Sequence, residues 1–311
     1  MIRKHTRRAA KAAFAISLGV AIVLGVYAAA FTHPAKATPK AGPTIIIGTK
    51  NFGEEYILGQ LYKQALEAKG FTIKYKENIG STELMTSALQ SGKINFYPEY
   101  TGVIVQDVFH HTSSPKTATA TYNLAKSLEK AKGYTLLKPT PFYDTDVLVV
   151  TNAFAKKHGL KSIGDLKKAG AFKLGGFPEC KTRNTCFLGY TKQYGLTKAS
   201  FVPLAGISVY AALDAGKIQA GDGFSTDPPL GKPSKYTVLA DPKHVTGFQN
   251  VAPIVKTSVA TAAGATFTRT VNAVSAKLTL PAIVAMNKAF YVDKRSAASI
   301  AKAFLKANGL A

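Results

Sequence analysis

Cys180 and Cys186 are the only cysteines in the chain, and five residues, including Arg183, separate them. Such a pair either closes a short loop as a disulfide or supplies a nucleophile or metal ligand. The nearest preceding histidine is His158, and the Cys-x5-Cys spacing is not a zinc pattern. In an exported chain we expect the disulfide, which would stiffen the loop that carries Arg183; a reactive or metal-binding cysteine is the alternative.

The sequence contains no pattern typical of an enzyme site. It has no Ser–His–Asp order, no Gly-rich phosphate loop and no cluster of metal-ligand residues. His110, His158 and His244 are scattered over predicted helix ends and loops. Glu54 and Glu55 open a predicted helix, where acids complement the helix dipole without a catalytic role. We therefore predict that the protein is not an enzyme and needs no cofactor or metal.

Strand and helix patterns alternate from residue 44 onward. A β-branched run at 44–48 predicts a buried strand, and an apolar stripe at 54–69, closed by glycine, predicts a helix. Residues 71–76 alternate as a strand, and Ser81 caps a second helix that ends before a glycine. This order predicts an α/β fold with a largely parallel, doubly wound sheet that binds ligands at the carboxyl ends of its strands.

A short internal repeat suggests two such lobes. Residues 88–94 (ALQSGKI) return as residues 212–218 (ALDAGKI), and in both copies an aromatic residue, Tyr100 or Phe224, follows six positions later. A match of this length can arise by chance, because helix–Gly–strand junctions are common. As a true repeat, it places equivalent loops of two lobes on either side of a cleft, which suits capture of a small molecule.

The N-terminal region is separate from the rest. Five basic residues and no acid occupy residues 1–12, an uncharged apolar run covers 13–31, and an Ala-x-Ala site ends at Ala37. This pattern predicts a secretory signal peptide over residues 1–37. The alternative is a retained membrane anchor at 13–31, because the run is long enough to span a bilayer. Both interpretations place the functional part outside the cytoplasm.

The chain has 311 residues and a formal net charge of +23, which raises the question of nucleic-acid binding. Beyond residue 37 the net charge is +17, and of its 34 basic residues only Arg183, Arg269 and Arg295 are arginine. Base readout favours arginine, and the lysines form no stripe interleaved with aromatics. We predict no nucleic-acid partner and a lysine-rich surface that faces an anionic envelope. An apolar content of 46% indicates a globular chain, and its length favours two domains.

Several motifs together resemble a known family. They are GTKNFGEEYILG at 48–59, GSTE at 80–83, YPEYTG at 97–102, PE at 178–179 before Arg183, FSTD at 224–227 and VAP at 251–253. The series resembles the glycine betaine/carnitine/choline substrate-binding proteins of osmoprotectant ABC transporters and covers the chain from about residue 44. The resemblance implies the type II periplasmic-binding-protein fold, with two doubly wound α/β lobes around a ligand cleft. It implies a first lobe of residues 44–146 plus 252–311 and a second lobe of residues 147–251.

The resemblance also implies ligand-binding residues. A quaternary ammonium has no N–H to donate, so proteins hold it against aromatic faces, and a ligand carboxylate needs a cationic partner. By the family pattern, Tyr100, Phe224 and Phe248 are three walls of an aromatic cage. Lys50 and Arg183 are expected to hold a ligand carboxylate. An exposed loop arginine is the alternative for Arg183.

The sequence departs from the family pattern at one informative place. Where the pattern has another cage tyrosine, the chain reads Asp144-Thr145-Asp146, so the carboxylate of Asp146 replaces an aromatic wall. We take Asp144 and Asp146 as candidate ligand-binding residues. An acid in the pocket favours a ligand with net positive charge or an extra N–H or O–H donor, such as choline. The alternative is that Asp146 lies at the lobe crossover and pairs with a neighbouring lysine.

These observations predict an extracytoplasmic solute-binding protein of an ABC importer. It would capture a quaternary-ammonium compatible solute in an aromatic cage by lobe closure, act as a monomer and deliver the solute to a membrane permease. We expect it in the periplasm or on the outer face of the cytoplasmic membrane, with residues 13–31 as an optional anchor. The alternatives are another cationic or zwitterionic ligand, such as a thione betaine or an amino acid, and a membrane-anchored sensor with the same fold.

Overall fold

The computed structural model describes residues 42–113, 115–204, 208–231 and 233–310. The predicted signal peptide or anchor lies outside these residues. None of the helices in the described ranges combines the length and the apolar character needed to cross a membrane. The strands form two sheets of five.

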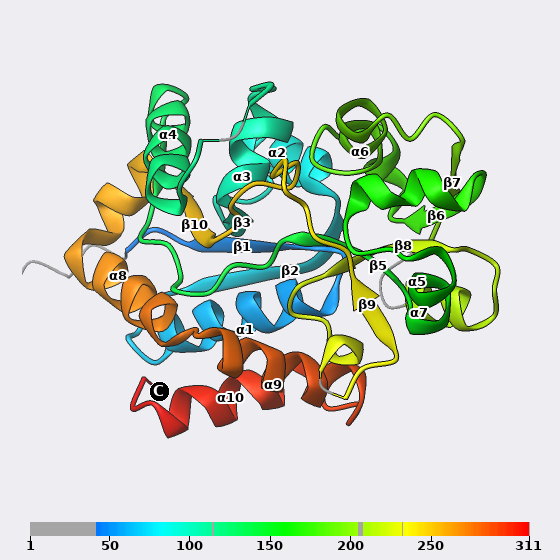
Figure 1. The fold of residues 1–311 in the computed structure, drawn as a ribbon. Coiled ribbons are helices and arrows are strands. Elements are labelled where there is room, and N and C mark those ends of the chain that lie inside the picture. The colour runs from blue at the N-terminus through cyan, green and yellow to red at the C-terminus, as the bar shows by residue number, and fades with distance from the viewer. Residues whose placement is uncertain (1–41, 114, 205–207, 232, 311) are drawn as a thin grey trace, which may run out of the picture. The chain divides into compact units, whose positions relative to one another are not determined.

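The first sheet has the strand order β2-β1-β3-β10-β4. Its strands are β1 (Ile45–Lys50), β2 (Ile73–Gly80), β3 (Phe96–Tyr100), β4 (Tyr134–Leu136) and β10 (Val251–Lys256). The helices that accompany it are α1 (Gly53–Glu67), α2 (Thr82–Gln90), α3 (Thr101–Val103), α4 (Ala118–Ala131), α8 (Thr257–Lys277), α9 (Leu280–Tyr291) and α10 (Ala297–Ala307). Figure 1 shows α1, α8, α9 and α10 on one face of this sheet and α2, α3 and α4 on the other.

Each face of the first sheet has its own apolar core. Strand residues with side chains on one face, such as Ile47 and Val255, pack with α1, α8, α9 and α10. Residues one position away, such as Ile254, pack with α2 and α4 on the opposite face. Because successive side chains of a strand point to opposite faces, this alternation produces a three-layer arrangement.

The second sheet has the order β7-β6-β8-β5-β9. Its strands are β5 (Asp146–Thr151), β6 (Phe172–Gly176), β7 (Ala199–Pro203), β8 (Ala220–Phe224) and β9 (Tyr236–Val238). Its helices are α5 (Asn152–His158), α6 (Phe187–Tyr194) and α7 (Ser208–Asp214), with 3-10 helices at Ile163–Ala169, Pro178–Lys181 and Pro228–Leu230. Two further cores, one on each face, hold this part together.

Both sheets are mixed: four of the five strands in each run in the same direction, and one is reversed. In the first sheet β1 runs parallel to β2 and β3, but β10 runs antiparallel to β3 and β4. In the second sheet β6 runs parallel to β7 and β8, but β5 runs antiparallel to β8 and β9. The reversed strands are the ones that the chain enters after passing from one sheet to the other. Such a strand starts at the edge where the parallel strands end, so it must run against them.

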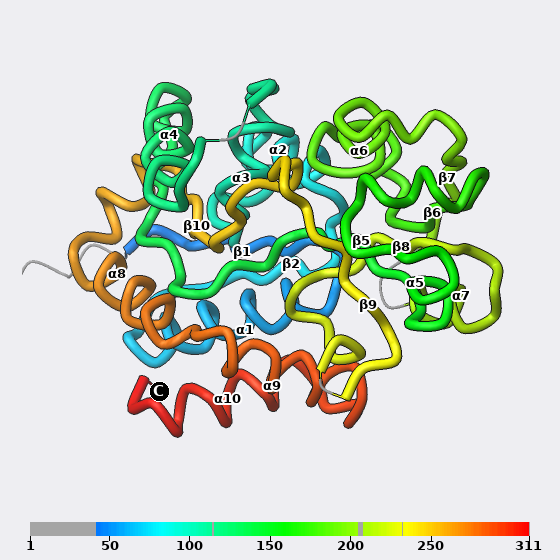
Figure 2. The backbone as a smooth tube through the Cα atoms, in the orientation of Figure 1, coloured from blue at the N-terminus to red at the C-terminus, as the bar shows by residue number. Residues whose placement is uncertain are grey.

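Two segments pass between the sheets, residues 137–145 and 239–250, and they run side by side (Figure 2). Tyr143 and Asn250 form an antiparallel β-bridge, and the Asp144 amide donates to the Gln249 carbonyl at 3.1 Å. The Thr145 and Thr246 hydroxyls are hydrogen-bonded at 2.9 Å. This pair of crossing segments brings the strand ends of the two sheets toward a shared site.

Candidate functional site

A cavity lies where the carboxyl ends of β1, β3 and β8 and the start of β5 meet. Its volume is about 50 Å³, room for a few water molecules. The lining residues are Lys50, Asn51, Phe52, Ser81, Thr82, Tyr100, Val103, Asp144, Asp146, Phe177, Glu179, Cys180, Arg183, Cys186, Asp222, Phe224 and Gln249. Six of the seven residues predicted to bind ligand are among them, and Phe248 is not.

Four aromatic rings gather at the cavity. The Phe52 ring stacks on Tyr100 at 6.2 Å between centroids and on Phe224 at 5.7 Å. Phe177 completes the group, 6.4 Å from Phe52 and 6.1 Å from Phe224. Phe248 instead contributes its carbonyl, which accepts a hydrogen bond from the Thr101 hydroxyl at 2.9 Å. The aromatic lining therefore lacks one predicted ring, Phe248, and includes two that were not predicted, Phe52 and Phe177.

Phe52 and Phe177 were missed by the sequence reasoning, although a signal for them existed. Phe177 directly follows β6, and Phe52 is the second residue after β1. Ligands of α/β sheets lie at the carboxyl ends of strands, so an aromatic residue there is a candidate contact. The repeat in the sequence did locate two ring positions, because β3 ends at Tyr100 and β8 ends at Phe224.

Lys50 is held by protein groups. Its ammonium forms an ion pair with Glu99, and both side chains are buried. The same ammonium lies 4.7 Å from the centre of the Tyr100 ring, which is a cation–π contact. The Lys50 amide donates to Glu55 at 3.1 Å, so the turn after β1 is fixed as well. Lys50 thus lines the cavity as predicted, but its charge is already balanced.

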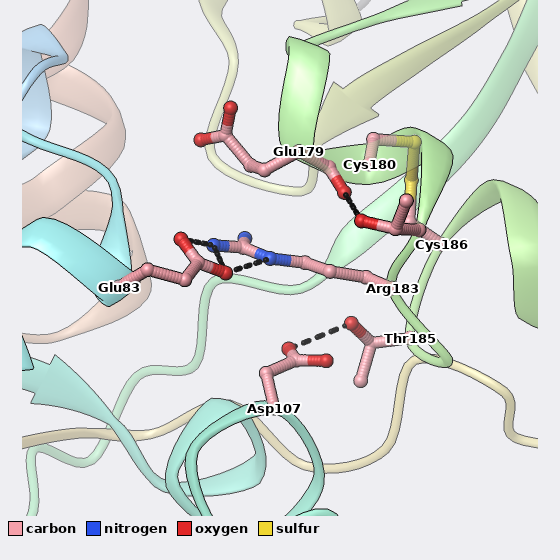
Figure 3. The surroundings of a disulfide bond; sticks show 8 residues. Glu83, Asp107, Glu179, Cys180, Arg183, Thr185 and Cys186 are labelled. Atoms are coloured by element: carbon pink, nitrogen blue, oxygen red, sulfur yellow. Dashed lines mark hydrogen bonds and ion pairs between the residues drawn. A yellow bond between two sulfur atoms is a disulfide. The ribbon is translucent and has the colours of Figure 1, made fainter.

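Arg183, which lines the cavity, forms an ion pair with Glu83 of α2 (Figure 3). Its guanidinium donates to both carboxylate oxygens of Glu83, at 3.1 and 3.2 Å. Nearby, the Thr185 hydroxyl donates to Asp107 at 2.9 Å. Glu83 and Asp107 belong to the part of the chain that forms the first sheet. Arg183 and Thr185, which lie in one loop of the other part, therefore connect the two parts.

The loop that carries Arg183 is closed by a disulfide between Cys180 and Cys186, also visible in Figure 3. This confirms the expected pairing. The two sulfurs and a carboxylate oxygen of Asp222 lie within 4.8 Å of one another, a set of three with metal-ligand character among the described residues. Because both sulfurs are bonded to each other, they cannot act as thiolate ligands.

Buried acids dominate the polar part of the cavity. Burial raises the pKa of Asp146 to about 7, with Asp107 adding to the shift while Arg183 and Lys50 oppose it. Burial and the neighbouring Glu54 hold the pKa of Asp144 well above its ordinary range. Asp144 accepts hydrogen bonds from the Thr226 amide at 3.2 Å and the Ser225 hydroxyl at 3.3 Å. In the described part of the chain, Asp146 belongs to no ion pair, so the alternative lysine partner is not found there.

Glu54 has a structural role that sequence reasoning did not anticipate. It is buried at the start of α1 and accepts hydrogen bonds from Tyr100 at 3.0 Å, Thr226 at 2.7 Å and Asn287 at 2.8 Å. Burial raises its pKa to about 7, against these three donors. Since the donors come from α9, β3 and the loop after β8, Glu54 fixes the position of the Tyr100 ring relative to both sheets.

The site thus combines aromatic faces with acids. Four acids (Asp144, Asp146, Glu179 and Asp222) and two basic residues (Lys50 and Arg183) line the cavity. A cation gains from the quadrupoles of desolvated rings and from carboxylates that lack a close counter-ion. The arrangement therefore suits a small organic cation.

Comparison with known proteins gives a consistent result. A family model described as the substrate binding domain of the ABC-type glycine betaine transport system matches residues 43–307. The chain is 31% identical over 228 residues to a glycine-betaine-binding protein of Pseudomonas aeruginosa, a match that covers 70% of this chain and 72% of that protein.

Two further relatives extend the comparison. Glycine betaine-binding protein YehZ of Escherichia coli is 29% identical over 235 residues (71% of this chain, 76% of that protein). Its apo structure superposes with a TM-score of 0.62 at 26% identity, covering 86% of this chain and 99% of that one. The ergothioneine transport permease/binding protein EgtU of Helicobacter pylori is 27% identical over 201 residues (64% of this chain, 36% of that protein).

Proposed function

The chain belongs to the family of substrate-binding domains of ABC-type glycine betaine transport systems, and we propose that it captures a quaternary-ammonium solute in the cavity between its sheets. Members of this family are transport components and not enzymes, and substrate-binding proteins of ABC importers work outside the cytoplasm. The observation that carries the ligand class is the convergence of four aromatic rings with four acids on one cavity. A methylated ammonium makes no ordinary hydrogen bond, so rings and carboxylates are the groups that can hold it.

We infer that Tyr100 and Phe224 are the main aromatic contacts, with Phe52 and Phe177 beside them. The Tyr100 hydroxyl donates to Glu54, and Phe224 is paired with Asp146 on the neighbouring strand β5. Rings with fixed positions lose little conformational entropy when a ligand arrives, which favours binding. Phe248 is a cage wall only if the chain around it moves toward the cavity.

Lobe movement is part of the proposal, because a cavity of about 50 Å³ is smaller than a quaternary-ammonium solute. We infer that the predicted lobes, residues 44–146 plus 252–311 and residues 147–251, rotate about the two crossing segments. The Arg183–Glu83 pair and the Thr185–Asp107 hydrogen bond link loops of the two lobes at the mouth of the cavity. These contacts must open before a solute can enter.

The proposed partner is a membrane permease that receives the solute from the closed form. We propose that the protein is exported and acts as a monomer in the periplasm or on the outer face of the cytoplasmic membrane. Cleavage after Ala37 would release it, whereas a retained segment at 13–31 would tether it. The mass of the mature protein and its N-terminal sequence distinguish these two cases.

A thermal-shift panel tests the ligand class. The panel contains glycine betaine, choline, carnitine, ergothioneine (a thione betaine, which EgtU is named for) and the cationic amino acid arginine. We expect a rise in melting temperature that depends on ligand concentration for at least one quaternary-ammonium compound and none for arginine. A response to arginine alone, or to none of the methylated compounds, contradicts the proposal.

A further inference from the structure

Asp222 is a buried carboxylate with an unused acceptor in the wall of the cavity. It lies on β8, is 4% exposed and lines the cavity. Its Oδ1 accepts no hydrogen bond from any residue in the described ranges, and the side chain forms no ion pair there. Buried polar atoms in folded proteins almost always have a partner, so this oxygen calls for an explanation.

The surroundings hold Asp222 in place without satisfying it. Glycine at position 176 on the neighbouring strand makes room for it, because a Cβ there would lie 2.8 Å from the Asp222 Cβ and 3.4 Å from the Cys180 sulfur. On the adjacent β5, Asp146 pairs with Phe224 and Leu148 pairs with Asp222, so both acids point to the same face of the sheet. Two acids and one aromatic ring therefore border the same part of the cavity.

The charges of the two basic residues of the cavity are already balanced by protein carboxylates in this structure. Lys50 is paired with the fully buried Glu99, and Arg183 is paired with Glu83. The carboxylate of a zwitterion such as glycine betaine would compete with these protein carboxylates for the two cations. A cation without a carboxylate meets no such competition, and it finds acids that lack a counter-ion.

We infer that the cavity selects a net cation that carries an O–H or N–H donor besides its quaternary ammonium, and that Asp222 accepts this donor. The inference rests on the proposed function and narrows its ligand class. The aromatic rings hold the methylated end, and the orphan carboxylate orients the polar end. Asp222 is then a specificity-determining residue.

The expected preference for a ligand with a hydroxyl depends on the cost of leaving the buried acceptor without a donor. A site built to receive a hydroxyl discriminates strongly against an analogue without one, because the buried acceptor stays unpaired. Burial and the neighbouring Asp146 raise the pKa of Asp222 well above its ordinary value, and a bound cation favours the ionised form, which accepts stronger hydrogen bonds than a neutral group. We expect at least a tenfold preference for choline over n-propyltrimethylammonium, in which a methyl replaces the hydroxyl, and at least a tenfold preference over glycine betaine.

Titration calorimetry with these three compounds tests the inference on the wild-type protein, on Asp222→Asn and on Asp146→Asn. The first variant keeps the shape and replaces a carboxylate oxygen by an amide nitrogen that cannot accept, so the preference for choline over n-propyltrimethylammonium falls to less than threefold. The second variant is the matched control, a half-buried acid on the same sheet face. It weakens both cations by a similar factor and keeps their ratio. Circular dichroism and melting temperatures establish that each variant is folded.

The outcomes separate the inference from the proposed function. A wild-type protein that binds none of the three compounds, and none in the thermal-shift panel, overturns the proposed function and this inference together. Quaternary-ammonium binding with glycine betaine as tight as choline, or with equal affinity for choline and its methyl analogue, overturns only the inference. These comparisons need no variant, so a poorly folded Asp222→Asn does not weaken the test. Loss of the preference in Asp146→Asn instead of Asp222→Asn assigns the acceptor to Asp146 and also overturns it.

Discussion

Replacing Phe224 by alanine tests the aromatic part of the site most directly. The ring is only partly buried, and it packs 5.7 Å from Phe52 and 6.1 Å from Phe177. A desolvated cation–π contact contributes about 2 kcal/mol, so its loss weakens binding roughly 30-fold. A ligand at 100 times its dissociation constant stabilises the folded protein by about 2.7 kcal/mol. After a 30-fold weakening, the same concentration provides only about 0.9 kcal/mol.

The assay is a ligand-dependent shift in melting temperature. For a chain of this size, each kcal/mol raises the melting temperature by roughly 2 °C, so the shift falls from about 5 °C to about 2 °C. Phe201→Ala is the matched control, because this partly buried ring packs on Phe187 at 5.2 Å and does not line the cavity. The control lowers the melting temperature without ligand but keeps the shift. An unchanged shift in Phe224→Ala, or an equal loss in both variants, would refute the assignment of this ring.

Two further predictions concern buried charge. Lys50→Met leaves Glu99 buried without its counter-ion, and we expect the free energy of unfolding in urea to fall by about 3–5 kcal/mol. The control Lys63→Met breaks an exposed pair and should lower it by less than about 1 kcal/mol; equal losses would contradict the prediction. Burial, with the charge of Glu99, raises the pKa of Glu129 to about 7, so between about pH 4.5 and 7 the unfolded chain has released a proton that the folded protein retains. The free energy of unfolding therefore falls as pH rises through this window. We expect this fall, measured between pH 5 and pH 8, to be smaller in Glu129→Gln than in the wild-type protein by up to about 3 kcal/mol. Parallel pH profiles of the two proteins would argue against it.

The local elements could be predicted because neighbouring residues determine them. The strand expected at 44–48 is β1, and the helix expected at 54–69 is α1 within two residues. Ser81 precedes α2, as the cap pattern predicted. The second strand was placed too short, because β2 continues to Gly80 past the polar residues 76–78. Pairing with β1 extends it there, and no alternation of apolar residues marks that part.

The site was predicted less completely, because its partners are far apart in the sequence. Resemblance to the family supplied Lys50 and Arg183, yet nothing in the local sequence shows that Glu99 and Glu83 are their partners, 49 and 100 positions away. The same holds for Glu54, whose acid at the start of a helix has an ordinary surface explanation. Only the packing of α9, β3 and the loop after β8 around it turns it into a buried acceptor for Tyr100. Such roles follow from tertiary contacts, and a single sequence carries no direct record of them.

Basic residues outnumber acids in the whole chain, whereas acids outnumber basic residues in its cavity. The part beyond residue 37 carries +17, nearly all of it lysine, whereas four acids and two basic residues line the cavity. Exposed charges are screened over roughly 8 Å at physiological ionic strength, but buried acids act at contact in a medium of lower dielectric constant. A small cation therefore meets modest repulsion outside and strong attraction inside. We propose that the acids Asp144, Asp146 and Asp222, and not the surface charge, determine which solute the protein retains.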